Sequence, residues 1–275
     1  MTLSGKTIFI TGASRGIGRA IALRCARDGA NIIIAAKTGE PNPKLPGTIH
    51  SVAEEVEAAG GHALPIVLDV RDEVRIGYAI GDSVQRFGGI DAVINNAGAI
   101  SLTSTANTPM KKFDLMVGVN VRATFAASQA ALPFLQKSSN PHILNISPPI
   151  DLNPRWLNGH VAYTISKYGT TMCTIGMAAE LASAGIAVNS LWPRSIIDTV
   201  ALRLLGGDSL TKASRTGEIM ADAAYAILTT PSRELTGQCF LDETFLRSRG
   251  VTDFDKYAIS PGTPLIPDLY VSDMN

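Results

Sequence analysis

The sequence predicts an α/β fold in which a parallel, seven-stranded sheet is doubly wound, with helices on both faces. Short apolar, β-branched runs recur along the chain, helical patterns fill most of the gaps between them, and a glycine-rich segment follows the first run. Strands that alternate with helices form βαβ units, whose right-handed crossovers place helices on both faces of one sheet. The seven runs are Thr7–Ile10, Asn31–Ala35, Ala63–Leu68, Asp91–Ile94, His142–Ile146, Ile186–Leu191 and Gln238–Leu241.

A glycine-rich segment, here called the glycine loop, follows the first strand and opens a helical pattern. It reads Thr11-Gly12-Ala13-Ser14-Arg15-Gly16-Ile17-Gly18. The glycines let the backbone turn tightly and approach a pyrophosphate, whose charge is favoured by exposed N–H groups and by the positive end of the helix dipole. The spacing departs from the commonest dinucleotide fingerprint, so other motifs must decide the subclass. We expect a Rossmann-type site in which the cofactor contacts Gly12, Ser14, Arg15, Gly16, Ile17 and Gly18.

Cofactor choice depends on the end of the second strand. An acidic residue there would accept from a ribose 2′-hydroxyl and repel a 2′-phosphate, but this chain has Ala36 and Lys37. Together with Arg15, Lys37 can form a positive clamp on that phosphate. Two solvated basic residues are the alternative. The sequence therefore predicts NADP(H) in preference to NAD(H).

Three irregular stretches follow the second, fifth and sixth strands. They are Lys37–Gly47, Pro148–His160 and Trp192–Gly207. Loops after these strands all emerge at the carboxyl edge of a parallel sheet, where ligands bind. Function is therefore expected at this edge.

Tyr163 and Lys167 stand four residues apart at the start of a long helical pattern, so they share one helix face. The pKa of a tyrosine hydroxyl is about 10, so proton transfer near neutrality needs a neighbouring positive charge that favours the phenolate. Lys167 can supply that charge. A half-buried ring beside a solvated amine is the alternative interpretation.

The chain resembles the short-chain dehydrogenase/reductase family over roughly residues 5 to 241. Four motifs carry the resemblance in order: the glycine loop, Asn95-Asn96-Ala97-Gly98, Asn120 and the Tyr163–Lys167 pair. The chain is similar specifically to the hydroxysteroid-dehydrogenase-like subgroup. This rests on Ile34-Ala35-Ala36-Lys37, Asn145-Ile146-Ser147-Pro148-Pro149 and Asp255-xx-Ala258.

The resemblance implies an oxidoreductase that moves a hydride between a nicotinamide and a carbonyl or secondary alcohol. It implies that Tyr163 exchanges a proton with the substrate oxygen, that Lys167 lowers the pKa of Tyr163 and holds the nicotinamide ribose, and that Asn120 anchors a water relay. For Asn120, an amide that kinks its helix by bonding local backbone is the alternative. Asn95 is expected to pin neighbouring strands and Asn96 to contact the cofactor.

Two acidic residues follow the third strand. Asp69 is placed to accept from the adenine amino group, and Asp72 to cap the following helix, although either could serve as the cap. We assign Asp69 to the cofactor and Asp72 to the cap.

The substrate side departs from the family pattern. Pro148 stands where the family places a catalytic serine, and Ser147 would replace that serine only if the following loop redirects it, because neighbours on a strand face opposite sides. Arg194 replaces a usual glycine and could meet an acidic substrate group, although an exposed arginine is the more ordinary interpretation. Apolar residues on the two cleft loops predict a pocket for a long or ring-shaped, lipid-like substrate, or they pack together. They are Trp156, Leu157, Trp192, Leu202, Leu204 and Leu205.

Length and composition indicate one domain, residues 1–275, in which residues 242–275 form an irregular C-terminal tail. The tail has three prolines and few helical signals, and we expect it to wrap near the ligand-binding edge or a partner subunit. With zero formal net charge and 17% charged residues, nothing indicates a nucleic-acid or membrane partner. The helical segments Ala123–Leu135 and Thr170–Leu181 are apolar nearly all round, which indicates that a partner subunit covers them unless the tail does. The family resemblance implies a homodimer or homotetramer.

Cysteine usage and hydropathy bear on compartment. Cys25, Cys173 and Cys239 are widely spaced, without a pattern for metal or redox work, so we expect no metal and a reducing environment. The chain shows neither a leader pattern nor an apolar run of the roughly 20 residues that span a bilayer. These features predict a soluble, cytoplasmic protein.

Two other function classes stay open. A nucleotide-binding scaffold could retain the phosphate loop while catalysis decays at Pro148 and Arg194. An apolar-ligand carrier could use the same pocket without a nicotinamide cofactor. Similar sheets host unrelated functions, so the fold does not separate these classes.

Overall fold

The computed structural model describes residues 1–42 and 45–272, apart from the side chain of Leu205. Seven parallel strands form one sheet in the order β3-β2-β1-β4-β5-β6-β7, which confirms the predicted fold class. The strands are β1 Thr7–Thr11, β2 Asn31–Ala36, β3 His62–Val67, β4 Ala92–Asn95, β5 His142–Ile146, β6 Ala187–Trp192 and β7 Cys239–Leu241.

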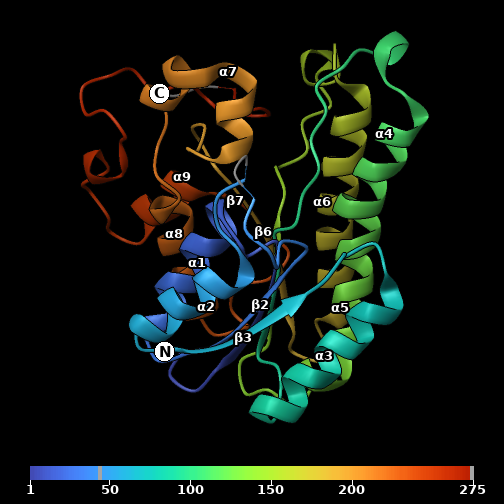
Figure 1. Ribbon diagram of the computed structural model, residues 1–275, viewed down its shortest axis with the longest axis vertical. Helices are drawn as coiled ribbons and strands as arrows, with labels where there is room; N and C mark the ends of the chain where they lie inside the picture. Colours follow the sequence, from blue (N-terminus) through green and yellow to red (C-terminus); the bar gives the residue numbers. More distant parts are fainter. Residues whose placement is uncertain (43–44, 273–275) are drawn as a thin grey trace.

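Helices cover both faces of this sheet (Figure 1). Helices α1, α2 and α8 lie on one side, and α3, α5 and α6 on the other. The described helices are α1 Gly16–Ala26, α2 Ile49–Ala58, α3 Glu73–Phe87, α4 Met110–Met116, α5 Ala123–Leu135, α6 Val161–Leu181, α7 Val200–Lys212, α8 Glu218–Leu228 and α9 Asp242–Ser248. Short helical turns are η1 Thr105–Asn107, η2 Val117–Arg122, η3 Pro154–Trp156 and η4 Asp255–Tyr257.

The central strands read as continuous apolar runs because both of their faces are buried. In β1, Ile8 and Ile10 pack into the cluster under α1 and α8, whereas Phe9 packs into the opposite cluster. These three side chains are fully buried. This alternation keeps the sheet rigid and fixes the strand ends that carry the loops of the ligand-binding edge.

Two segments predicted to be irregular contain helices. Within residues 192–207, α7 begins after Thr199, whose hydroxyl accepts a hydrogen bond from the Leu202 N–H. In the tail, α9 begins at Asp242, whose carboxylate accepts from the Glu243 N–H. Each start is stabilised by an oxygen acceptor at a helix N-terminus. Asp72 caps α3 as predicted, by accepting from the Arg75 N–H.

The tail returns to the carboxyl edge of the sheet, as one of the two expected placements had it. The Ile196 N–H donates to the Ile266 carbonyl, and the Ile266 N–H donates to Ala213 at the end of α7. Among the helices described, none combines the length and apolar character needed to cross a membrane.

Candidate functional site

A cleft of about 580 Å³ opens at the carboxyl edge of the sheet. Its size falls in the range of small-molecule sites. The cleft brings together most of the predicted site residues, namely Gly12, Ser14, Arg15, Gly16, Ile17, Lys37, Asp69, Asn96, Tyr163 and Lys167. Gly18, Asn120 and Ser147 do not line it. In the part of the chain that the structure describes, no His, Cys, Asp and Glu cluster forms a metal site.

Two glycines of the loop leave no room for a side chain. A Cβ on Gly12 would lie 2.8 Å from the Ala97 Cα, and Gly12 has a φ of +68°. A Cβ on Gly18 would lie 2.4 Å from the Asn96 Nδ2. The Asn96 Nδ2 in turn donates to the Thr11 and Gly12 carbonyls. Gly18 therefore acts through packing, and the loop beside the N-terminus of α1 fits a pyrophosphate.

The two predicted phosphate-binding cations differ in their partners. The Arg15 guanidinium donates to the Thr38 hydroxyl and to the carbonyls of residues 45, 46 and 47, which are all uncharged acceptors. The Lys37 Nζ lies 3.2 Å from the Asp69 carboxylate, which also accepts from the Arg71 guanidinium. Hydrogen bonds from Arg71 hold the pKa of Asp69 well below its ordinary value. Of the loop that follows Lys37, Pro43 and Lys44 lie outside the described residues.

Asn95 and Asn120 both bond within the protein. The Asn95 Nδ2 donates to the Asn145 Oδ1 on the neighbouring strand at 2.8 Å, as expected of a residue that pins strands. The Asn120 side chain accepts from the Ala99 N–H and donates to the Ser166 hydroxyl. Asn120 lies in η2, where the helix widens into a π-turn before α5. These partners are distant in the sequence, so the side chain does not make the local backbone bonds of the helix-kinking alternative, and its role in a water relay stays a proposal.

Tyr163 and Lys167 lie in the first two turns of α6 and are both almost fully buried. The Lys167 Nζ donates to the Ile146 carbonyl at the end of β5, 2.8 Å away, and lies 5.1 Å from the centre of the Trp192 ring. Burial lowers the pKa of Lys167 to about 8, against the opposing effect of Asp268. The ammonium therefore stays charged at neutral pH.

Burial dominates the titration of Tyr163. It raises the pKa of Tyr163 well above its ordinary value, and the neighbouring Tyr270 and Asp268 raise it further. The hydroxyl is therefore protonated at pH 7. Desolvation, and not the expected lowering by Lys167, dominates this pKa.

Ser147 is not brought to the cleft. Its side chain is fully buried, and its Oγ has no hydrogen-bond partner among the described residues. The loop after β5 therefore does not turn Ser147 outward. The neighbouring Pro148 carbonyl accepts from the Thr171 hydroxyl of α6, which holds this stretch against the helix.

The sequence analysis was wrong about the exposure of Arg194. Its side chain is 12% exposed and lies 3.2 Å from the Glu243 carboxylate, so it is not the exposed arginine that was expected. Glu243 also contacts Arg215 and Arg247. The cluster ties the loop after β6 to α9.

The predicted apolar residues separate into two groups. Trp192 and Leu204 line the cleft, whereas Trp156 lies against Tyr270 of the tail. The side chain of Leu205 lies outside the described residues. Sequence reasoning missed Tyr270 and Asp268, because nothing local to the tail signals that it packs on residues about 100 positions earlier.

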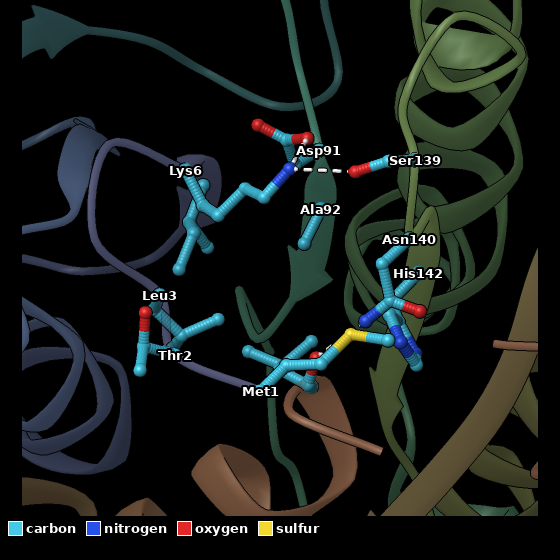
Figure 2. Close-up of a pocket in the computed structure, with 11 residues that line it drawn as sticks. Met1, Thr2, Leu3, Lys6, Asp91, Ala92, Ser139, Asn140 and His142 are labelled. Carbon is cyan, nitrogen blue, oxygen red and sulfur yellow. Dashed lines mark hydrogen bonds and ion pairs between the residues drawn. The ribbon is translucent and has the colours of Figure 1, made fainter. Parts of the chain in front are cut away.

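A second cavity of about 240 Å³ lies at the opposite edge of the sheet. Figure 2 shows that the Lys6 ammonium reaches Asp91 and Ser139, at 3.1 and 2.9 Å. The His142 Nε2 bonds the Thr230 carbonyl, and burial lowers the pKa of this histidine to about 4. Lys6 and Asp91 directly precede β1 and β4, and His142 begins β5. Their bonds therefore indicate that these groups stabilise the amino edge of the sheet.

Residues 6–205 match the family model described as short chain dehydrogenase. Hydroxysteroid dehydrogenase-like protein 2 of Danio rerio is 58% identical over 269 residues, covering 98% of this chain and 64% of the relative. The chain thus spans less than two thirds of the length of that relative.

Solved structures show the same architecture. A short chain dehydrogenase from Mycobacterium thermoresistibile has a TM-score of 0.95 and 51% identity, covering 100% of this chain and 98% of that one. A Mycobacterium paratuberculosis short chain dehydrogenase bound to NAD has a TM-score of 0.75 and 25% identity, covering 90% and 100%. A metagenomic short-chain oxidoreductase in complex with NADP has a TM-score of 0.73 and 25% identity, covering 88% and 98%.

Proposed function

The chain belongs to the short chain dehydrogenase family, and from that premise we propose that it is an NADP(H)-dependent oxidoreductase that interconverts a carbonyl group and a secondary alcohol on an apolar, lipid-like substrate. One observation carries the proposal: Tyr163 and Lys167 line the same cleft as the glycine loop. The proton-transfer residue and the phosphate-binding backbone therefore face one space.

The residues present fit a dinucleotide. The absence of a side chain at Gly12 would leave room for the pyrophosphate beside the backbone. Lys167 would hold the nicotinamide ribose. When bound, the nicotinamide supplies or accepts the hydride. Solved relatives carry NAD in one case and NADP in another, so the preference rests on this chain's own residues. Arg15 and Lys37 support a 2′-phosphate, since no acidic residue ends β2.

Tyr163 is proposed as the proton donor and acceptor at the substrate oxygen. Its hydroxyl carries its proton at neutral pH, which suits donation to a carbonyl oxygen during reduction. The charged Lys167, held by the Ile146 carbonyl, stabilises the phenolate left after donation.

NADPH oxidation by the purified protein tests this function. The substrates are steroid, fatty-acyl and small aldehyde or ketone compounds, and Tyr163→Phe runs in parallel. Because positioned general acids contribute about 10²- to 10⁴-fold, we expect the variant to lose at least about 100-fold in kcat. Its affinity for NADPH, measured by fluorescence titration, stays near that of the wild type. Equal turnover by both proteins would refute the role of Tyr163.

A nucleotide-binding scaffold without turnover is the second candidate. The observations that favour it are Pro148 at the usual serine position and the buried Ser147 hydroxyl. This candidate predicts that NADPH binds while no carbonyl compound is reduced. The same assay therefore separates the two functions.

A further inference from the structure

The tail places one aromatic ring in the middle of the predicted apolar pocket. Tyr270 is 3% exposed. Its ring centre lies within 6.5 Å of five other ring centres, those of Trp156, His160, Tyr163, Tyr168 and Trp192. The Tyr270 and Thr164 hydroxyls lie 3.1 Å apart, and the Thr164 proton goes to the Trp156 carbonyl at 2.6 Å. Tyr270 is therefore the donor of this pair, and its ring orientation is fixed.

A tight turn presents this ring. The Val271 N–H donates to the Asp268 carbonyl, and Tyr270 is the third residue of that turn, with a φ of +71°. Turns of this kind normally place glycine at that position. Tyr270 is the sole non-glycine residue with positive φ in the described part of the chain. A strained backbone persists only where its surroundings hold it, and here the ring supplies those contacts.

Hydrogen bonds hold the segment that leads into the turn. The Asp268 N–H donates to the Arg194 carbonyl, and the Trp192 Nε1 donates to the Leu269 carbonyl at 2.8 Å. Pro267 forms a bridge with Ser195. Tyr270 is thus part of a fixed wall and not of a mobile flap.

The wall stands directly behind the cleft. Tyr163 and Trp192 line the cleft, and Tyr270 contacts both rings from the side of Trp156. The space between the loop after β5 and the end of β6 is therefore filled by the chain itself. A substrate at the Tyr163 hydroxyl has only the cleft, which it shares with the dinucleotide.

We propose that Tyr270 is a specificity-determining residue that closes the substrate pocket behind Tyr163 and restricts it to narrow, unbranched alkyl carbonyl compounds, excluding fused-ring ones. This inference rests on the proposed function, which it narrows. It narrows the expectation of a pocket for a long or ring-shaped substrate to the first of these, because Tyr270 packs against both Trp156 and Trp192.

Three substitutions distinguish the effect of the Tyr270 ring from that of the backbone turn. Tyr270→Gly removes the ring and suits the positive φ, and Tyr270→Asn does the same with a residue that also tolerates this conformation. Tyr270→Phe keeps the ring and removes the hydroxyl. Tyr78→Ala, on an exposed part of α3, is the remote control. NADPH titration of each variant verifies that the cofactor cleft is intact.

The first readout is ligand binding, which does not depend on turnover. The chain has two tryptophans, Trp156 and Trp192, and both contact Tyr270, so tryptophan fluorescence reports on this pocket. With NADP⁺ present, the proteins are titrated with 2-octanone, a straight-chain ketone, and with trans-1-decalone, a fused-ring ketone. We expect saturable binding of the decalone to Tyr270→Gly and Tyr270→Asn but not to the wild type or to Tyr270→Phe. Equal decalone binding by all four proteins would overturn the proposal, whatever the turnover.

The second readout is turnover of the same two ketones with NADPH. We expect Tyr270→Gly to raise the ratio of kcat/KM for the decalone to that for 2-octanone at least about tenfold, and Tyr270→Phe to change it less than about twofold. If Tyr270→Gly binds NADPH normally but its ratio of kcat/KM for the two ketones equals that of the wild type, the proposal is overturned. If no variant turns over either ketone while the decalone binds only to Tyr270→Gly and Tyr270→Asn, the size restriction stands and the proposed function is what fails.

Discussion

At the scale of single residues, Lys37 can change partners at little cost. Its ammonium pairs with Asp69 across an exposed surface, and the Asp69 carboxylate keeps its hydrogen bonds to Arg71 when Lys37 leaves. Arg15 adds a guanidinium whose described acceptors are uncharged. We propose that both cations exchange these partners for a 2′-phosphate.

Lys37→Asp should invert the preference between NADPH and NADH. The substitution replaces a charge-assisted hydrogen bond, worth about 1.5–3 kcal/mol, with repulsion, so NADPH affinity should fall by about 10- to 100-fold while NADH affinity holds or rises. Fluorescence titration of both cofactors measures the ratio. Lys137→Asp, at an exposed position just after the end of α5, controls for net charge. An unchanged ratio of NADPH to NADH affinity would contradict the proposed clamp of Arg15 and Lys37 on the 2′-phosphate.

Residue positions were predictable where the pattern that fixes them is local. Spacing alone places Tyr163 and Lys167 on one face of α6, and the absence of an acidic residue after β2 is visible in the sequence. The side-chain environments of Ser147 and Arg194 were not predictable. The first depends on how a loop turns after β5, and the second on an ion pair with Glu243, which lies 49 positions later.

At the scale of elements, the outer faces of α5 and α6 carry large apolar side chains in water. Phe125, Ile165, Met172 and Ile175 are each 46% exposed or more. The tail, which was the alternative cover, lies instead at the carboxyl edge of the sheet. A second copy of the chain is therefore the proposed cover, since a two-fold interface matches one patch to itself.

Met172→Glu should convert the assembly to monomers. A carboxylate opposed by its symmetry mate in an apolar interface is desolvated and unpaired, which costs more than such contacts provide. Light scattering at micromolar concentration should give a dimer or tetramer for the wild type and a monomer for the variant. Tyr78→Glu, on exposed α3, should leave the mass unchanged. A monomeric wild type would contradict this assembly.

Strand positions were predictable to within about one residue, because a strand buried on both faces leaves an unbroken apolar run. Helices α7 and α9 were not predicted. Helix α7 lacks an apolar stripe that would predict it. The first turn of α9 is stabilised by Asp242, whose carboxylate also accepts a hydrogen bond from the distant Arg194 N–H. Tertiary contacts decide these two elements.

At the scale of the whole molecule, buried acids join the tail to the sheet edge. Burial raises the pKa of Asp268 to about 7 and that of Asp242 to about 6. The ordinary pKa of an aspartate is about 3.9, so the folded chain binds more protons than the unfolded chain between these values. Stability contributed by these two acids is therefore full below about pH 4 and is lost as pH rises toward 7.

Asp268→Asn should flatten this pH dependence. The amide cannot ionise, so the fall in the free energy of unfolding between pH 5 and pH 7 becomes smaller than in the wild type. Urea unfolding at about half-unit intervals of pH measures the slope. Asp114→Asn, an exposed carboxylate of α4, should leave the slope unchanged. A variant slope equal to that of the wild type would show that Asp268 does not titrate in this range.

The chain order of the site also has a consequence for synthesis on the ribosome. The last strand of the sheet ends at Leu241, and every predicted cofactor contact precedes it, whereas the ring behind Tyr163 arrives only with Tyr270. Because chains emerge from the amino end at about 5–20 residues per second, the dinucleotide cleft is translated seconds before the wall of the substrate pocket. On the proposed function, a nascent or clipped chain that lacks Tyr270 would bind the dinucleotide but leave the substrate pocket open behind Tyr163.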